Sequence, residues 1–266
     1  MASRIAFLMY HELKVPARPV CQNEPGYIHY VVSVSDFKTQ MQTLKASGWQ
    51  GSSVSQALGF PQAPTVALCF DDGCETDLIA AAPILQELGF GATCYVTSGF
   101  LGSKGYLSAE QLRSLSVGRF EIGCHSMTHP DLTSLDTSQL IHETAGAKHV
   151  LEQILGIPVK HFSCPGGKWN SRTVDAVKSA GFESMATSRP GVNTRHTSLF
   201  ALTRVPILRG TTIDEFTRIC HGQGIFWTQL QERTRRAARH ALGDSIYQSL
   251  RNRLLARTYT SDLDDR

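Results

Sequence analysis

The stretch Thr65–Gly73 reads TVALCFDDG, and it decides how the chain around it is interpreted. A run of mostly apolar residues leads directly into two adjacent carboxylates and a glycine, which predicts a buried strand that ends in a turn. Parallel α/β folds place their chemistry at the carboxyl ends of their strands. Adjacent side chains in a turn point in different directions, so we expect Asp71 and Asp72 to face different partners, one a metal and the other a substrate.

Outward from this stretch, short apolar runs alternate with segments of helical period. Ser35 and Asp36 are expected to cap a helix that Gly48 ends, and further helices follow the same rhythm, the longest from about Thr137 to Leu155. Strands are expected at RIAFLMY, ATCYV, FEIGCH, HFSCP, ESMAT and LTRVPI. Regular alternation of strand and helix predicts a parallel α/β architecture, either a barrel or a doubly wound sheet.

The pattern changes near Cys220, which divides the chain into a barrel at residues 1–219 and a basic extension at residues 220–266. The extension predicts two amphipathic helices and a polar tail. Two interpretations stay open, packing on the outside of the barrel or association with a membrane surface. The second rests on a set of arginines, namely Arg233, Arg235, Arg236, Arg239, Arg251, Arg253 and Arg257.

Composition excludes several classes of protein. The chain has 266 residues and a formal net charge of only +3. A nucleic-acid-binding protein usually has a concentrated basic surface, so this weak charge does not by itself indicate a nucleic-acid partner. The seven cysteines are an odd number without a Cys-x-x-Cys pair, which is typical of a reducing compartment. The apolar run near the N-terminus is too short for a signal peptide, and none elsewhere could cross a bilayer. We therefore expect a cytoplasmic protein.

A pair of histidines lies in Gly123–Leu132, which reads GCHSMTHPDL. His125 and His129 are four residues apart, so a helical turn between them would bring both rings to one side of the backbone. That spacing alone is weak evidence for a metal site. Together with a carboxylate at the end of another strand, however, two imidazoles make a three-ligand set that leaves room for water and substrate.

Three segments carry a resemblance to a known family. CFDDG, GCHSMTHPDLT and FSCPGG resemble the Asp-Asp, His-Ser-x-x-His and third motifs of the polysaccharide deacetylase superfamily, a group of carbohydrate esterases with the nodulation-type deacetylase homology domain. LMYHEL and DFKTQMQTLKASGW resemble more narrowly the bacterial exopolysaccharide and poly-N-acetylglucosamine deacetylases. The matching segments run from Ile5 to Ile207. The resemblance implies a distorted (β/α)7 barrel, with the C-terminal helices as an extension outside the match.

The resemblance also implies a reaction. Asp72, His125 and His129 would bind one divalent ion, most often zinc, and activate water for attack on an N-acetyl carbonyl. Asp71 would be the general base. The implied activity is hydrolysis of the N-acetyl group of an N-acetylhexosamine, in a glycan or glycan precursor, to acetate and a free amine. An N-acetylated sugar is then the partner.

Two further roles follow from the resemblance. A backbone N–H in the third motif, here at Gly166, would stabilise the oxyanion. The general acid would be His11, because the branch with a permuted motif order takes this histidine from the first strand. The family's third motif begins with an arginine, whereas this chain has Ser163. Arg204 would either reach the site or hold the strand end, and Trp169 would either stack on a sugar ring or pack between barrel elements.

Alternatives remain at this stage. The chain could hydrolyse another C–N bond, as in formyl or ureide substrates, or be a non-catalytic glycan-binding relative. Without a signal peptide, a nucleotide- or lipid-linked precursor is a more accessible substrate than an extracellular polymer. The sequence specifies neither the sugar, the linkage, the native metal nor the oligomeric state.

Overall fold

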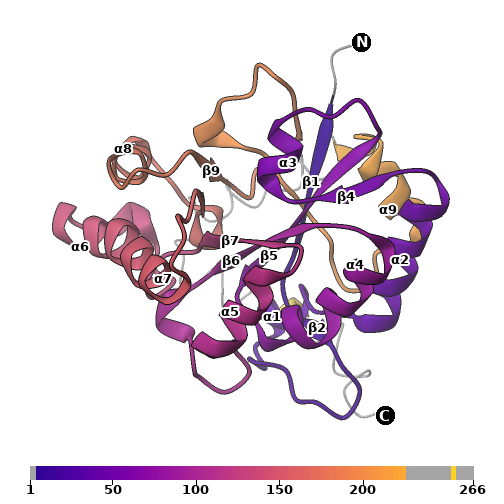
Figure 1. Cartoon of the computed structure of the whole chain (residues 1–266), viewed down its shortest axis with the longest axis horizontal. Coiled ribbons are helices and arrows are strands. Elements are labelled where there is room, and N and C mark those ends of the chain that lie inside the picture. Colours follow the sequence, from indigo (N-terminus) through magenta and orange to yellow (C-terminus); the bar gives the residue numbers. More distant parts are fainter. Residues whose placement is uncertain (1–3, 226–252, 256–266) are drawn as a thin grey trace.

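A curled, mostly parallel sheet forms the centre of the computed structural model, which describes residues 4–225 and 253–255 (Figure 1). Seven strands follow the order β10-β1-β5-β6-β7-β8-β9, while β11 pairs with β1 and β4 pairs with β5. All of these pairings are parallel except β1 with β10. The strands are β1 Ile5–Tyr10, β4 Gln50–Ser52, β5 Thr65–Asp72, β6 Ala92–Val96, β7 Phe120–Cys124, β8 His161–Ser163, β9 Ser184–Ala186, β10 Val192–Asn193 and β11 Val205–Pro206.

Helices surround this sheet, as expected for a distorted (β/α)7 barrel, and the fold class is confirmed (Figure 1). α2 contacts α4 and α9, and α5 contacts α7. The α-helices are α1 Pro25–Ile28, α2 Val34–Ala46, α3 Val54–Leu58, α4 Ala82–Leu88, α5 Ala109–Val117, α6 Thr137–Ile141, α7 Ala147–Leu155, α8 Ser171–Ser179 and α9 Ile213–Cys220. A small second sheet pairs β2 Leu13–Lys14 with β3 Val32–Ser33.

The central strands are buried on both faces, which explains their continuous apolar runs. Every residue of β1 and β5 is buried, including the two carboxylates that end β5. Helix α2 adds Phe37, Met41 and Leu44 to the core from outside the sheet. The side chains at the carboxyl ends of the strands are thus held by a well-packed support.

The helices differ from the sequence-based expectation in two ways, one a shifted boundary and the other an additional helix. α2 begins at Val34, and its cap is Ser33, whose Oγ accepts from the Asp36 backbone N–H at 3.0 Å. Ser33 rather than Ser35 is the N-cap, because the extended backbone of Ser33 directs its hydroxyl toward the third backbone N–H of the helix. Helix α5 was not anticipated, although Ser108 and Gln111 have the spacing of a capping box and do form one.

The long helix expected from Thr137 to Leu155 is present as three consecutive segments. α6 leads into a π-helical turn, His142–Gly146, and α7 follows to Leu155. Gly156 ends it in the left-handed conformation, with φ of 70°. Apart from residues 220–225 and 253–255, the predicted basic extension at residues 220–266 lies outside the described residues. Within the described residues no helix combines the length and apolarity needed to span a membrane.

Candidate active site

Three predicted metal ligands converge at the carboxyl ends of β5 and β7. His125 Nε2 and His129 Nε2 each lie 3.6 Å from Asp72 Oδ1. Asp72 is the last residue of β5, and His125 directly follows β7. Because β5, β6 and β7 are neighbours with parallel register, their ends meet at one edge of the barrel. The topology, rather than the local spacing of the histidines, brings this set together.

Asp72 has the features of a metal ligand. Its Oδ1 is buried and has no hydrogen-bond partner among the described residues, although buried carboxylate oxygens are normally bonded. One ligand atom from each of the three residues lies within 4.8 Å of the others. Two imidazole nitrogens and a carboxylate oxygen form a donor set that suits zinc and related divalent ions. The residues present therefore fit the metal that the sequence motifs predict.

The orientation and charge of His125 also suit coordination. Its Nδ1–H donates to the Ser163 carbonyl oxygen at 2.9 Å, which fixes the ring and directs the Nε2 lone pair toward Asp72. Burial lowers the pKa of His125 to about 4, and the nearby Asp71 and Asp72 charges only partly oppose that effect. The ring is therefore neutral at neutral pH. A neutral imidazole can bind a metal, whereas a protonated one cannot.

The segment between the two histidines is a strained loop rather than a helical turn. Ser126 and His129 have φ of 68° and 62°, a left-handed conformation that side chains other than glycine rarely adopt. Glu143, from the π-helical turn, accepts hydrogen bonds from Met127 N at 2.9 Å, Thr128 N at 2.9 Å and Thr128 Oγ1 at 2.7 Å. This buried carboxylate holds the loop and thereby His129. Nothing in the sequence motif indicated Glu143.

Arg204 occupies the position behind Asp71, where it replaces the arginine missing from the third motif. Its Nη1 and Nη2 donate to Asp71 Oδ1 and Oδ2 at 2.7 and 2.8 Å, and Nη2 also donates to Ser163 Oγ at 2.8 Å. Arg204 is fully buried and donates from Nε to the Thr187 carbonyl oxygen. Arg204 thus reaches the site through Asp71, and its buried guanidinium has no exposed surface with which to contact a substrate directly.

The bidentate pair determines the charge of Asp71. Burial alone would raise the pKa of this carboxyl, but the Arg204 guanidinium, His125 and His11 together outweigh burial and lower it. The pKa of Asp71 is therefore held well below its usual range. Asp71 Oδ2 lies 3.9 Å from His125 Nε2, so an ionised carboxylate stands directly beside the three-ligand set.

His11 follows β1 and lies close enough to both aspartates for their charges to raise its pKa, although burial is the larger effect and lowers it. Its ring packs against Tyr30 with centroids 4.7 Å apart, and its Nδ1 is buried without a hydrogen-bond partner in the described residues. The first strand thus delivers a histidine to the same site, as expected of the permuted motif order.

The third motif follows β8. Gly166 is exposed and has φ of 58°, and an added Cβ there would meet nothing within 4 Å. Gly167 has φ of 66°, and a Cβ there would lie 2.4 Å from Ser188 Cβ. The two glycines therefore permit a backbone turn pressed against the end of β9. Trp169 is half-buried and packs against the core, which fits the packing interpretation of this residue.

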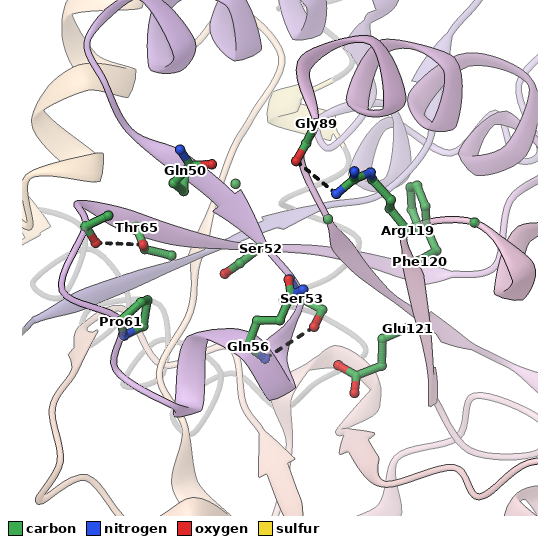
Figure 2. A pocket seen from close by; sticks show the side chains of 14 residues that line it. Gln50, Ser52, Ser53, Gln56, Pro61, Thr65, Gly89, Arg119, Phe120 and Glu121 are labelled. Atoms are coloured by element: carbon green, nitrogen blue, oxygen red, sulfur yellow. Dashed lines mark hydrogen bonds between the residues drawn. The ribbon is translucent and has the colours of Figure 1, made fainter.

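A separate cavity of about 500 Å³ lies at the opposite end of the strands (Figure 2). Its lining includes Thr65 and Phe120, the first residues of β5 and β7, and Arg119, whose Nη1 donates to the Gly89 carbonyl oxygen at 3.3 Å. None of the predicted site residues lines it. Because Asp72 and His125 lie at the carboxyl ends of the same strands, this cavity is distinct from the candidate active site.

Comparison with known proteins agrees with the geometry. Residues 60–185 match the polysaccharide deacetylase family, and this range includes Asp71, Asp72, His125 and His129. This segment of the chain is a polysaccharide deacetylase domain. The resemblance found in the sequence motifs is thereby confirmed, and the class of activity is carbohydrate deacetylation.

Relatives of this deacetylase extend over a larger part of the chain. The polysaccharide deacetylase homologue YxkH of Bacillus subtilis is 25% identical over 226 residues, which are 80% of this chain and 75% of that protein. A chitooligosaccharide deacetylase of Azorhizobium caulinodans is 28% identical over 126 residues, 47% of this chain and 58% of that protein.

Solved structures share the fold. The Streptococcus pyogenes deacetylase PplD in complex with acetate has a TM-score of 0.73 at 23% identity, and the match covers 83% of this chain and 99% of that one. IcaB from Ammonifex degensii has a TM-score of 0.68 at 21% identity, with 85% of this chain and 97% of that one covered. At this level of identity, the two structures support the fold assignment and leave residue roles to the geometry above.

Proposed function

We propose that this deacetylase is a metal-dependent N-deacetylase that hydrolyses the acetamide of an N-acetylhexosamine, in a glycan or glycan precursor, to acetate and a free amine. One observation carries the proposal. Two histidine Nε2 atoms converge on a buried, unpartnered Asp72 Oδ1, and an ionised Asp71 stands beside them. The name of the chitooligosaccharide deacetylase relative supports an N-acetylated amino sugar as substrate.

Asp72, His125 and His129 would hold the ion, with zinc the best fit to their donor atoms. Such an ion, when bound, lowers the pKa of water to about 7 and polarises a carbonyl group. The His125 ring is already oriented for this task by its bond to the Ser163 carbonyl oxygen. His129 side-chain exposure of 36% leaves the site open on the side of this ring, where a substrate can approach.

Asp71 would accept the proton of the attacking water. Arg204 anchors both carboxylate oxygens, so the base is held in one orientation, with its Oδ2 3.9 Å from His125 Nε2. The same contact makes Asp71 a weak base, because its pKa is held well below the usual range. The base would therefore depend on a water that the metal ion has acidified.

The leaving amine and the oxyanion need further groups. His11, in the protonated form that the Asp71 and Asp72 charges favour, would donate the proton to the amine as the C–N bond breaks. The Gly166 N–H would donate to the carbonyl oxygen as its negative charge develops. Trp169, next to this turn, would offer the exposed part of its ring to a sugar. After acetate and the amine leave, Asp71 would release its proton to solvent and His11 would regain one, which returns both groups to their starting states.

The experiment that tests this function measures acetate release from N-acetylhexosamine oligosaccharides and from nucleotide- or lipid-linked N-acetylated precursors. Zinc-loaded protein should release acetate from at least one of them, and Asp71→Asn should reduce the rate by about 10²-fold or more while zinc binding is retained. Folded, metal-bound protein that releases no acetate but cleaves formyl or ureide substrates would replace the proposal. Release of acetate unaffected by Asp71→Asn would refute the role of Asp71.

A further inference from the structure

A second group of metal-binding side chains lies next to the catalytic turn, and the proposed reaction does not use it. Glu12 follows His11, Cys21 lies in the loop between β2 and α1, and Cys74 comes two residues after Asp72. One ligand atom from each lies within 4.8 Å of the other two. Their sulfur atoms are 3.8 Å apart. We call Glu12, Cys21 and Cys74 the thiol cluster.

The surrounding chain holds the thiol cluster in place. Glu12 Oε2 accepts from the Cys21 backbone N–H at 2.8 Å and from the Tyr27 hydroxyl at 3.0 Å. Gly105 has φ of 93°, and a Cβ at this residue would lie only 2.7 Å from Cys21 Sγ. Because Gly105 has no side chain, there is room for the Cys21 sulfur at this position. Glu12 and Cys74 are buried, whereas Cys21 is half-buried, so the cluster opens toward solvent at Cys21.

The donor atoms and their spacing suit a thiophilic cation. Two sulfur ligands on tetrahedral zinc, each at about 2.3 Å, are separated by about 3.8 Å. The separation of Cys21 Sγ and Cys74 Sγ in the structure is also 3.8 Å. Carboxylate ligands are usually held by hydrogen bonds of their own, and Glu12 has two on one oxygen. Thiolates favour zinc over magnesium or calcium.

We propose that Glu12, Cys21 and Cys74 bind a second divalent cation, with zinc the best fit. Each thiol gives up its proton to solvent as the ion binds, and water fills the open coordination position beside Cys21. The ion joins the end of β1, the loop before α1 and the turn after β5. It is thus a structural brace for the turn that carries Asp71 and Asp72, and it does not depend on the proposed reaction.

Cobalt substitution tests the site, because a thiolate bound to Co²⁺ gives a charge-transfer band in the near ultraviolet that histidine and carboxylate ligands do not give. The full chain, reduced and loaded with Co²⁺, should show this band, and zinc-loaded protein should contain two equivalents of zinc by elemental analysis. Cys21→Ser should lose the band and one equivalent of zinc. Cys220→Ser, at a buried cysteine of α9 outside the cluster, is the matched control and should keep both.

Asp72→Asn separates this proposal from the proposed function. This variant should lose the zinc of the His125–His129 site and keep the thiolate band. A band that is absent from folded wild-type protein, or that persists unchanged in Cys21→Ser, would overturn the proposal. Recovery of a Cys21–Cys74 disulfide peptide from protein purified in zinc, with no second equivalent of metal, would also overturn it.

Discussion

At the scale of single residues, the proposed reaction depends on the pairing of Arg204 with Asp71. A buried guanidinium with both Nη groups on one carboxylate fixes direction as well as charge. Lysine has one point charge and cannot reproduce this geometry. The substitution Arg204→Lys should therefore lower kcat by at least about tenfold even where the protein folds.

Removal of the charge should cost stability as well. Arg204→Ala leaves Asp71 buried without its partner, so the free energy of unfolding should fall by about 3–5 kcal/mol in urea titrations. Arg172→Lys, at an exposed arginine of α8, is the control and should change neither kcat nor stability. Wild-type kcat in Arg204→Lys would show that Asp71 needs no fixed orientation.

Glu143 is a positioning residue rather than a catalytic one. It accepts three hydrogen bonds from the loop that carries His129. In Glu143→Gln one oxygen becomes an NH₂ group that faces a donor, so the loop should relax and zinc affinity should fall by about 10–100-fold. The zinc concentration that restores half of the acetate release measures this change. Glu87→Gln, at an exposed position of α4, is the control and should leave this zinc concentration unchanged.

At the scale of elements, strand β7 must pass very close to β6 to deliver His125. A Cβ at Gly123 would lie 2.4 Å from Tyr95 Cδ1 and 3.1 Å from the His161 carbonyl oxygen. Gly123→Ala should therefore destabilise the protein by about 1–3 kcal/mol and shift His125, lowering the melting temperature and the acetate release together. Gly118→Ala, where the closest contact is an ordinary 3.4 Å, is the control. An equal effect of both substitutions would contradict this explanation.

The strands and helices around the site could be predicted from the sequence. The apolar runs of β5, β6 and β7 and the glycines after the helices determine the alternation of strand and helix, so the local pattern was enough to predict it. The contact of Arg204 with Asp71 could not be predicted, because the two residues are 133 positions apart and meet only when the sheet curls. The π-helical turn that carries Glu143 could not be predicted either, because residues 137–155 keep a helical period throughout.

At the scale of the whole molecule, a polar network at the amino ends of the strands should set the acid limit of stability. Glu121 accepts from Thr93 Oγ1 at 2.9 Å and from the Ser55 N–H at 3.1 Å, and it pairs with His161. Burial would raise the pKa of Glu121, but His161 and Ser55 outweigh burial and lower the pKa from 4.5 to about 2.

Because its pKa is lowered in the folded protein, Glu121 stabilises the fold in its ionised form. The stabilisation is complete above pH 4.5 and is lost as the pH falls toward about 2, because the unfolded chain binds the proton first. Glu121→Gln should therefore reduce the free energy of unfolding by on the order of 2 kcal/mol at about pH 7, with the difference shrinking near pH 2.5. Urea titrations at both pH values, with Glu110→Gln as the exposed control, measure it. A difference that stays constant with pH would refute the ionic origin.

Asp72, His125 and His129 lie at or after the ends of two strands and, in the proposed reaction, would act together through one metal ion. The most direct test is acetate release from an N-acetylglucosamine oligosaccharide by chelator-treated protein as zinc is added back, with His129→Ala alongside. We predict no release without metal, full recovery with zinc, and no recovery in the variant at the same zinc concentration. Release that persists after complete removal of metal, or that recovers equally in His129→Ala, would contradict metal-dependent hydrolysis at this site.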